Sequence, residues 1–419
     1  MASSESLIPY PYLPALIRER LRFIGPGLIL AMSSSGWVGL LTLLSLGSDY
    51  GYQLLWAIIA VLVYKYAFNR GIARYTVSQG ENIYAGLRRI PGLRTLEAPV
   101  FGGIYLIEVM SHGAGAMVAA TLLTSLLPFE VPARLTAILM IAVITAILYH
   151  NSYPLFKKIM VVAGVIIICG LLYNLHSLYF SVPDIAYGLI PDPGNNEQLF
   201  YIGSIMATLG TGLSLLCYSM WLQKEIGGAH GEVFFKEHMR SVSFDITLGF
   251  LLLALLSFFY LSIGFVVMNE EGLPAFENDL MIRLIGHMIN TVPFGMTIFV
   301  IISFLTLFVY LIGAMDGRAR AVATIIAQTM NLKDAEDRLY RGVVLVFAGI
   351  FILFAFIGDK YLAKEMFTLA MMIFGLVGLL LIYLDRTLPP YARGSWLWYG
   401  VMATGSVLFP VASIYYAMI

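Results

Sequence analysis

The sequence predicts an all-α polytopic membrane protein with about eleven transmembrane helices. Of its 419 residues, 59% are hydrophobic and only 12% are charged, and the mean hydropathy is +0.84. So few charges would not cover the surface of a soluble protein, and lipid must therefore be the main solvent of the chain. Apolar runs of roughly 20 residues, enough to cross a hydrocarbon core about 30 Å thick, recur from end to end.

Each apolar run is expected to form one span, and the fourth and ninth are short. The predicted spans are residues 24–46, 52–68, 99–126, 135–149, 159–179, 200–222, 246–268, 294–315, 342–357, 367–384 and 396–418. The first run is too long for a signal peptide and lacks a small-residue cleavage pattern. No long polar segment interrupts the series, so residues 1–419 are predicted to form a single membrane domain.

The loops indicate how these spans are oriented in the cell membrane. With a cytoplasmic N-terminus, only four of the 25 lysine and arginine residues lie outside, namely Arg134, Arg283, Lys360 and Lys364. The opposite orientation would contradict the tendency of cytoplasmic loops to carry the positive charge. An odd number of spans then puts the C-terminus outside.

Composition and motifs argue against several other classes of protein. A net charge of zero disfavours a nucleic-acid partner. Cys169 and Cys217 lie in apolar runs, so we expect neither a disulfide nor a thiolate metal site. No phosphate-binding loop and no histidine pair with metal-binding spacing occurs. We therefore expect a protein that is not an enzyme and has no cofactor, and the oligomeric state stays open.

The first span contains a polar interruption, which is informative because a helix facing lipid should be uniformly apolar. Ser33, Ser34, Ser35 and Gly36 lie together halfway across, and Gly39 follows one turn later. Glycine weakens a helix, and hydroxyl groups can satisfy freed backbone groups. This stretch is therefore predicted to unwind where it borders protein or water.

The sixth span has a matching interruption, formed by Thr208, Gly210, Thr211, Gly212 and Ser214. The first and sixth spans hold corresponding positions in two five-helix halves. That pattern is typical of inverted-repeat transporters, whose broken helices meet at a site near the middle of the membrane. The alternative is that these small residues only allow close packing of helices.

Gly25-Pro26-Gly27 and the stretch YGYQLLW at residues 50–56 are two landmarks at the start of the chain. Together they resemble the opening of the natural resistance-associated macrophage protein (Nramp) family of divalent-metal transporters, with similar spacing and no gap. The resemblance implies the LeuT-type fold, in which two inverted five-helix repeats are followed by one extra helix. The repeats would be about residues 24–180 and 200–384, and the extra helix about 396–418.

The family's metal ligands do not carry over to this chain. The family's first-span motif Asp-Pro-Gly-Asn aligns with Gly36-Trp37-Val38-Gly39, so both metal-binding side chains are replaced by glycine. Its sixth-span motif Met-Pro-His aligns with Ser214-Leu215-Leu216, so the thioether is missing as well. The resemblance is therefore to a divergent branch that has none of the classical ligands for manganese or iron.

Glu108 and His112 are ionisable residues within the third span, where a charged group costs at least about 2.5 kcal/mol at mid-depth. Because they are four residues apart, they share a helix face and are expected to touch. One interpretation is a proton-coupling pair, since Glu108 lies roughly where the family has an aspartate linked to proton movement. The other is a hydrogen-bonded pair that joins two helices.

Further polar features have structural interpretations. Lys65 is expected to snorkel to the cytoplasmic headgroups. Asp316 is expected to form an ion pair at the inner surface with Arg318 or Arg320, and residues 223–240 are expected to include a helix lying on that surface. Trp37 is expected either to wall the substrate site or to pack in the core.

Together these observations predict a secondary transporter that works by alternating access. The substrate site is expected to contain Ser33, Ser34, Ser35, Gly36, Trp37, Gly39, Thr211, Gly212 and Ser214. Hydroxyl and unwound carbonyl oxygens suit a cation that keeps part of its water shell. The resemblance favours a divalent metal, with proton coupling through Glu108 and His112. The alternatives are a small polar organic solute as the substrate, or a receptor that keeps the fold without transport.

Overall fold

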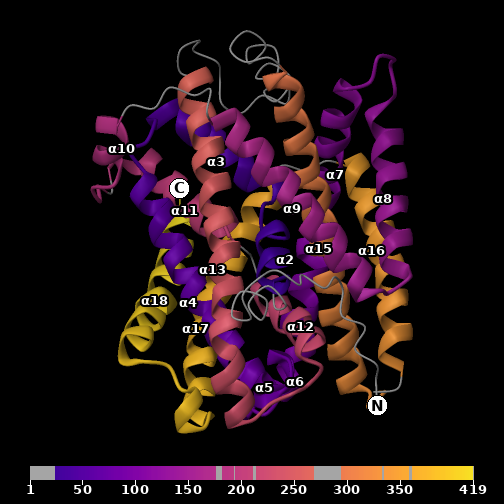
Figure 1. Ribbon diagram of the computed structural model, residues 1–419, viewed down its shortest axis with the longest axis vertical. Coiled ribbons are helices and arrows are strands. Elements are labelled where there is room, and N and C mark those ends of the chain that lie inside the picture. The colour runs from indigo at the N-terminus through magenta and orange to yellow at the C-terminus, as the bar shows by residue number, and fades with distance from the viewer. Residues whose placement is uncertain are drawn as a thin grey trace, which may run out of the picture.

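The computed structural model describes residues 24–175, 182–192, 194–210, 214–268, 294–332, 335–357 and 361–418, and no strand occurs in these ranges. The elements are α2 (Pro26–Met32), α3 (Trp37–Tyr50), α4 (Leu55–Gln79), α5 (Ile83–Leu87), α6 (Leu93–Glu97), η1 (Ala98–Gly102), α7 (Gly103–Ser125), α8 (Ala133–Tyr149), α9 (Tyr153–Leu175), α10 (Val182–Gly188), α11 (Asn196–Thr208), α12 (Ser214–Ile226), α13 (Glu232–Ile263), η2 (Gly264–Met268), α15 (Gly295–Thr329), α16 (Glu336–Ile357), α17 (Tyr361–Thr387), η5 (Pro390–Ala392) and α18 (Trp396–Met418). Figure 1 shows the long helices side by side, with α2 near the centre and with α17 and α18 on the flank opposite α8 and α16.

The predicted all-α membrane fold is confirmed. Each of the eleven predicted spans coincides with a helix or with two successive helices. Seven helices of the described ranges are long and apolar enough to cross a membrane. The first span is a bent pair, α2 and α3, whose axes differ by 63°. α8, the fourth span, is a shorter apolar helix, in line with its short apolar run.

The second span extends further than the sequence predicted. Hydropathy placed its end at residue 68, whereas α4 continues to Gln79. The additional turns contain polar side chains that are buried in the bundle and bonded there. Asn69 is fully buried, and Arg74 forms a buried ion pair with Asp385 on α17 at 2.8 Å. Hydropathy assigned these residues to a loop because burying a polar side chain without a partner costs free energy. Bonding inside the protein offsets that cost.

The predicted surface helix within residues 223–240 is wrong. α12 continues to Ile226, and Glu232 already belongs to α13, which is one helix of 32 residues. Only a short turn separates the two, and three glycines with positive φ make it, Gly227, Gly228 and Gly231. Residues that carry a side chain rarely adopt a positive φ, so these glycines explain how the chain reverses so sharply.

Close backbone packing fixes the first span against α13. A Cβ atom at Gly47 would overlap the carbonyl oxygen of Leu261, and one at Gly249 would overlap the carbonyl oxygen of Gly27. The buried carboxylate of Asp245, also on α13, accepts the backbone N–H groups of Gly25 at 3.0 Å and Gly27 at 2.5 Å. Glycine and a capping carboxylate thus hold both halves of the first span on one helix.

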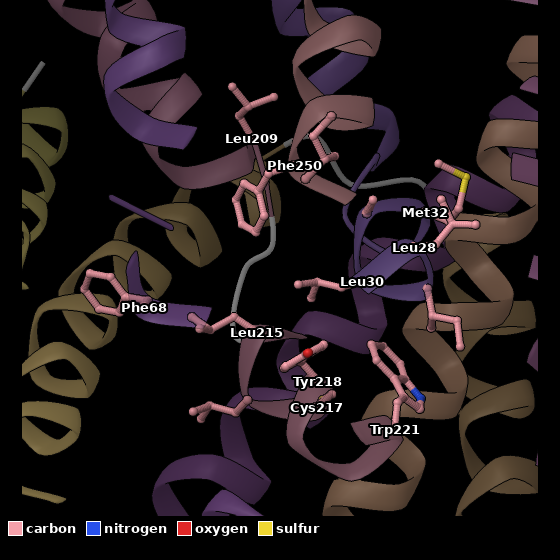
Figure 2. Packing of buried hydrophobic residues seen from close by; sticks show 14 of the residues in the cluster. Leu28, Leu30, Met32, Phe68, Leu209, Leu215, Cys217, Tyr218, Trp221 and Phe250 are labelled. Atoms are coloured by element: carbon pink, nitrogen blue, oxygen red, sulfur yellow. The ribbon is translucent and has the colours of Figure 1, made fainter. Parts of the chain in front are cut away.

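The first half-helix of the first span, α2, also packs near the second half-helix of the sixth span, α12. Figure 2 shows Leu28, Leu30 and Met32 of α2 beside Tyr218 and Trp221 of α12 in one buried cluster. Every residue of α2 is buried. A helix buried on all sides can end inside the protein without exposing its backbone to lipid.

We predict that Gly47→Ala destabilises the protein by about 1–3 kcal/mol, because the added methyl group has no space against the α13 backbone. Thermal unfolding in detergent, followed by size-exclusion chromatography, measures the effect. The control is Gly349→Ala on α16, where a Cβ atom meets nothing within 4 Å. Equal melting temperatures for the two variants would contradict the close approach of α3 and α13.

Candidate functional site

The first span is interrupted at residues 33–36, between α2 and α3, and we call this segment the first break. Its three consecutive serines each donate a hydroxyl hydrogen bond to the backbone carbonyl four residues earlier. The bonds run from Ser33 to Ile29 (2.6 Å), from Ser34 to Leu30, and from Ser35 to Ala31 (3.1 Å). The last turn of α2 is therefore closed by its own side chains.

The first break presents both acceptors and donors to its surroundings. Each serine hydroxyl has one hydrogen, which is already donated, so only its oxygen lone pairs remain. The backbone carbonyls of Ser33, Ser34 and Ser35 accept no hydrogen bond from the described residues. α3 begins with Gly36 as its N-cap, and this residue has no side chain that could cap the first N–H groups. The positive end of the α3 dipole therefore lies at the break.

The second break follows α11, which ends at Thr208, and the structure describes Leu209 and Gly210 of it; α12 begins at Ser214. Leu209 has an extended backbone, with φ −77° and ψ 129°, and Gly210 has a positive φ of 63°. Thr208, the last residue of α11, donates its hydroxyl to the carbonyl of Ser204 at 2.7 Å. Its oxygen lone pairs are thus the part that remains available, as for the serines of the first break.

The start of α3 and the end of α11, which flank the two breaks, lie against each other. A Cβ atom at Gly39 would lie 3.4 Å from the carbonyl oxygen of Thr208. Beside them lies a space with about 70 Å³ of room for water-sized molecules, here called the central cavity. It is lined by Ser33, Ser34, Gly36, Trp37, Val38, Gly39, Glu108, Ser111, His112, Ala207, Thr208, Ser214, Tyr310 and Arg318. A second, much smaller cavity of about 10 Å³ borders the same residues on the side of α13.

Most of the predicted substrate residues gather around these two cavities. Ser33, Ser34, Gly36, Trp37, Gly39 and Ser214 line the central cavity, and Ser35 lines the second one. Thr211 and Gly212 lie outside the described residues. Both helices end at their interruptions, so the small residues there do more than allow close packing. Binding of a substrate by these residues stays a prediction.

Trp37 combines the two interpretations that the sequence left open. Its indole N–H donates to the backbone carbonyl of Ser111 at 3.2 Å, and a Cβ atom at Gly115 would lie 2.6 Å from its ring. The ring is therefore packed tightly against α7. It also lines the central cavity, so it forms a fixed part of the wall.

The prediction that Lys65 snorkels to the headgroups is wrong. Its side chain is fully buried, and its ammonium donates to the backbone carbonyl of Leu209 in the second break. The rings of Phe374 and Phe409 lie with their centres 4.8 and 5.9 Å from the ammonium nitrogen. A cation is favoured at the C-terminal end of a helix, here α11, and over aromatic rings, so Lys65 turns inward.

Glu108 and His112 both line the central cavity, but the predicted contact between their side chains is wrong. Arg318 on α15 donates from Nε to the Glu108 carboxylate at 2.8 Å, and both side chains are buried. His112 Nδ1 is bonded to the backbone carbonyl of Glu108. A permanently charged guanidinium binds a buried carboxylate more strongly than a neutral imidazole does, so Arg318 takes the carboxylate.

Asp316 is fully buried, so the predicted position at the inner surface is wrong. Its carboxylate pairs with Arg320 at 2.9 Å and accepts hydrogen bonds from Trp221 at 2.8 Å and Tyr340 at 2.6 Å. These partners come from α15, α12 and α16. The carboxylate therefore joins three helices inside the bundle, where its charge is compensated by Arg320.

The sequence did not reveal Tyr310 and Arg318 as cavity residues. Both lie on α15, with Ala314 midway between them, so the three follow the four-residue spacing of one helix face. That spacing was the available signal. The spacing alone does not indicate a cavity, because the partner of Arg318, Glu108 on α7, lies 210 residues away in the chain.

Comparison with known proteins finds a family model that matches residues 27–417, described as natural resistance-associated macrophage protein-like. An uncharacterised protein of Pasteurella multocida (strain Pm70) is 23% identical over 354 residues, which cover 80% of this chain and 77% of that protein.

Solved structures show the same fold. The manganese transporter of Eremococcus coleocola matches with a TM-score of 0.75 at 14% identity, over 98% of this chain and 88% of that one. Mhp1, a nucleobase-cation-symport-1 family transporter with bromovinylhydantoin bound, matches with a TM-score of 0.64 at 15% identity, over 99% and 94%.

We predict that Glu108→Leu destabilises the protein by about 3–5 kcal/mol, because Arg318 then remains buried without a partner. The double variant Glu108→Leu with Arg318→Met should recover most of this loss, since no unpaired charge remains. Melting temperatures in detergent measure both. As a control, Glu232→Leu removes the partner of exposed Lys236 and should cost less than about 1 kcal/mol. A single variant at Glu108 that melts like this control would contradict the buried pair.

Proposed function

Because this chain belongs to the natural resistance-associated macrophage protein-like family, we propose that it carries a partly hydrated divalent cation across the membrane by alternating access. The chain is a multi-pass membrane transporter of the LeuT-type fold. The fold it shares with a manganese transporter supports a metal cation as the substrate. In alternating access, the two interrupted spans move against the remaining helices around a site between them.

The observation that carries this proposal is the state of the hydroxyl groups around the central cavity. Ser33, Ser34 and Thr208 each donate their only hydrogen to a carbonyl of their own helix. Ser111 does the same toward the carbonyl of Glu108, at 2.9 Å. The hydroxyl groups of these four residues therefore offer only oxygen lone pairs to a substrate. These four hydroxyl groups by themselves favour a cation, or the hydrogen atoms of its water shell, over an anion.

The same lining supports a cation that keeps water. Gly36 in the first break and Gly39 in the first turn of α3 stand where the resembling family carries its carboxylate and amide ligands. In the described part of the chain, no three His, Cys, Asp or Glu residues lie together as a metal site. Neutral oxygens compensate poorly for stripping the water from a small divalent ion, so several water molecules would stay bound. The central cavity has about 70 Å³ of room for water-sized molecules, which is enough for a few of them.

Glu108 is the residue that we propose for proton coupling. It is a carboxylate on the central cavity, and its partner Arg318 lies on α15. A proton taken up by Glu108 would weaken its bond to Arg318 and so change the contact between α7 and α15. The charge distribution of the loops supports a cytoplasmic N-terminus and an outside C-terminus for this transport cycle.

A second candidate substrate is a small zwitterionic solute. The N-terminus of α3 supports it, since its N–H groups and its dipole favour a carboxylate, and the lone pairs of Ser33 and Ser34 would accept hydrogen bonds from an ammonium.

Uptake into proteoliposomes under a pH gradient, with Mg²⁺, Mn²⁺, Ca²⁺ and glycine as solutes, distinguishes a transporter from a receptor. Uptake of a divalent ion supports the proposal. Uptake of glycine alone would favour the second candidate, and uptake of no solute would favour a receptor.

We predict that Gly39→Leu abolishes uptake without unfolding the protein, because a branched side chain would fill the space between Gly39 and Thr208. Uptake is measured in proteoliposomes, and folding by size-exclusion chromatography. The control is Gly103→Leu at the start of α7, where a Cβ atom meets nothing within 4 Å. Uptake by the Gly39 variant at the rate of the control would contradict a passage between the two breaks.

A further inference from the structure

We propose that Lys65 binds and releases a proton in the transport cycle: its ammonium group fixes the end of α11 at the second break, and loss of the proton releases α11. Lys65 lies near the middle of α4 and is not among the residues that line the central cavity. The inference rests on the proposed transport by alternating access. It adds to Glu108 a second titrating group, which acts on α11 instead of α15.

The ammonium of Lys65 lies in a pocket of aromatic rings. Its nitrogen is 4.8 Å from the ring centre of Phe374 on α17 and 5.9 Å from that of Phe409 on α18. These two rings stack with centres 5.3 Å apart, and Phe68 on α4 meets both of them edge to face, at 6.1 and 6.3 Å. Because ring faces attract a cation, this pocket holds a buried charge better than aliphatic side chains would.

The same ammonium reaches the point where α11 ends. It donates to the backbone carbonyl of Leu209, the first residue after the helix, where the dipole of α11 is negative. A Cβ atom at Gly210 would lie 3.6 Å from Cδ of Lys65. α11 packs against α4, α17 and α18, and Figure 1 shows these helices on one flank. One side chain of α4 thus binds the end of a half-helix that alternating access requires to move.

In the described part of the chain, no acidic side chain forms an ion pair with Lys65. Titratable side chains on the helices around α4 bond to other residues. They are Tyr201 on α11, Glu225 on α12, Asp245 and Tyr260 on α13, Asp385 on α17 and Tyr399 on α18. Cys217 and Tyr218 on α12 are buried, and neither forms a hydrogen bond with Lys65 in the described structure. The charge of Lys65 is therefore stabilised by one carbonyl and by the rings.

This environment links the charge of Lys65 to the position of α11. If α11 moves away, the carbonyl of Leu209 and the negative end of the helix dipole leave with it. A fully buried ammonium without an acceptor is unfavourable, so the neutral amine is then the stable form. In that step one N–H bond of the ammonium breaks, its electron pair stays on Nζ, and the proton passes to a water molecule that the opened break admits. Return of the proton restores the bond to Leu209.

The test is amide hydrogen exchange of the full-length protein in lipid nanodiscs between about pH 5 and about pH 10, corrected for the intrinsic effect of pH on exchange. The amide of Leu209 donates to the carbonyl of Ile205 at 2.9 Å and so reports the last turn of α11. Its protection should be high at low pH, where Lys65 is charged. It should fall at least about tenfold as the pH rises, which is what one hydrogen bond to a charged group contributes. Protection that does not change with pH would overturn the inference.

Three variants identify the group that titrates. Lys65→Met has no charge, so the amide of Leu209 should be poorly protected at every pH. An apolar residue in place of a buried charge is usually tolerated, and size-exclusion chromatography verifies folding. Lys65→Arg keeps its charge, so protection should stay high throughout. Lys158→Met, at an exposed position on α9, is the control and should titrate like the natural protein. Natural pH dependence in Lys65→Met would overturn the inference, whether or not the larger guanidinium is accommodated.

Uptake of Mg²⁺, Mn²⁺ and glycine into proteoliposomes separates this inference from the proposed function. Uptake by the natural protein and by Lys158→Met should respond to a pH gradient, and the response should be lost in Lys65→Met. If a divalent ion is taken up with the same pH response in Lys65→Met, the inference is wrong and the proposed function stands. If glycine alone is taken up and the response depends on Lys65, the proposed substrate is wrong and the role of Lys65 stands.

Discussion

The fold of this chain depends on one constraint, which is that every backbone group inside a membrane must find a partner in the protein or in water that the protein admits. Two spans stop halfway across, and each interruption frees N–H and carbonyl groups where no lipid can bond to them. The chain satisfies part of these groups locally. The hydroxyls of Ser33, Ser34 and Thr208 bond to the carbonyls of the preceding turn, and the ammonium of Lys65 bonds to the carbonyl of Leu209. Ser33, Ser34 and Gly36 of the first break line the central cavity.

The surrounding helices hold this arrangement in place. α13 supports the first span through glycine contacts at Gly47 and Gly249 and through the carboxylate of Asp245 at the start of α2. α7 and α15 form the opposite wall and are joined by the buried pair of Glu108 and Arg318. The interrupted helices thus lie between a tightly packed support and a wall that carries charge. Such a division suits a transporter, in which a stable scaffold and a movable pair of helices must share one site.

The sequence predicted the features that depend on local pattern. The spans follow from hydropathy, and both interruptions follow from clusters of serine, threonine and glycine, because these residues weaken a helix wherever they occur. It could not predict contacts that link distant segments. Lys65 was expected at the headgroups because its partner, Leu209, lies 144 residues away, and Arg318 was expected at a surface because its partner is on α7. The division into repeats at about residues 24–180 and 200–384 stays a prediction.

Amide hydrogen exchange, followed by mass spectrometry of the protein in nanodiscs, tests the central claim most directly. The claim is that the first break leaves backbone N–H groups open to a water-filled cavity in the middle of the membrane. We predict that the amides of Trp37, Val38 and Gly39 exchange much faster than those of Leu43 and Leu44, one to two turns further along α3, and that a bound substrate slows them. Equal protection along the whole of α2 and α3 would show a span without an open break, and it would contradict the account.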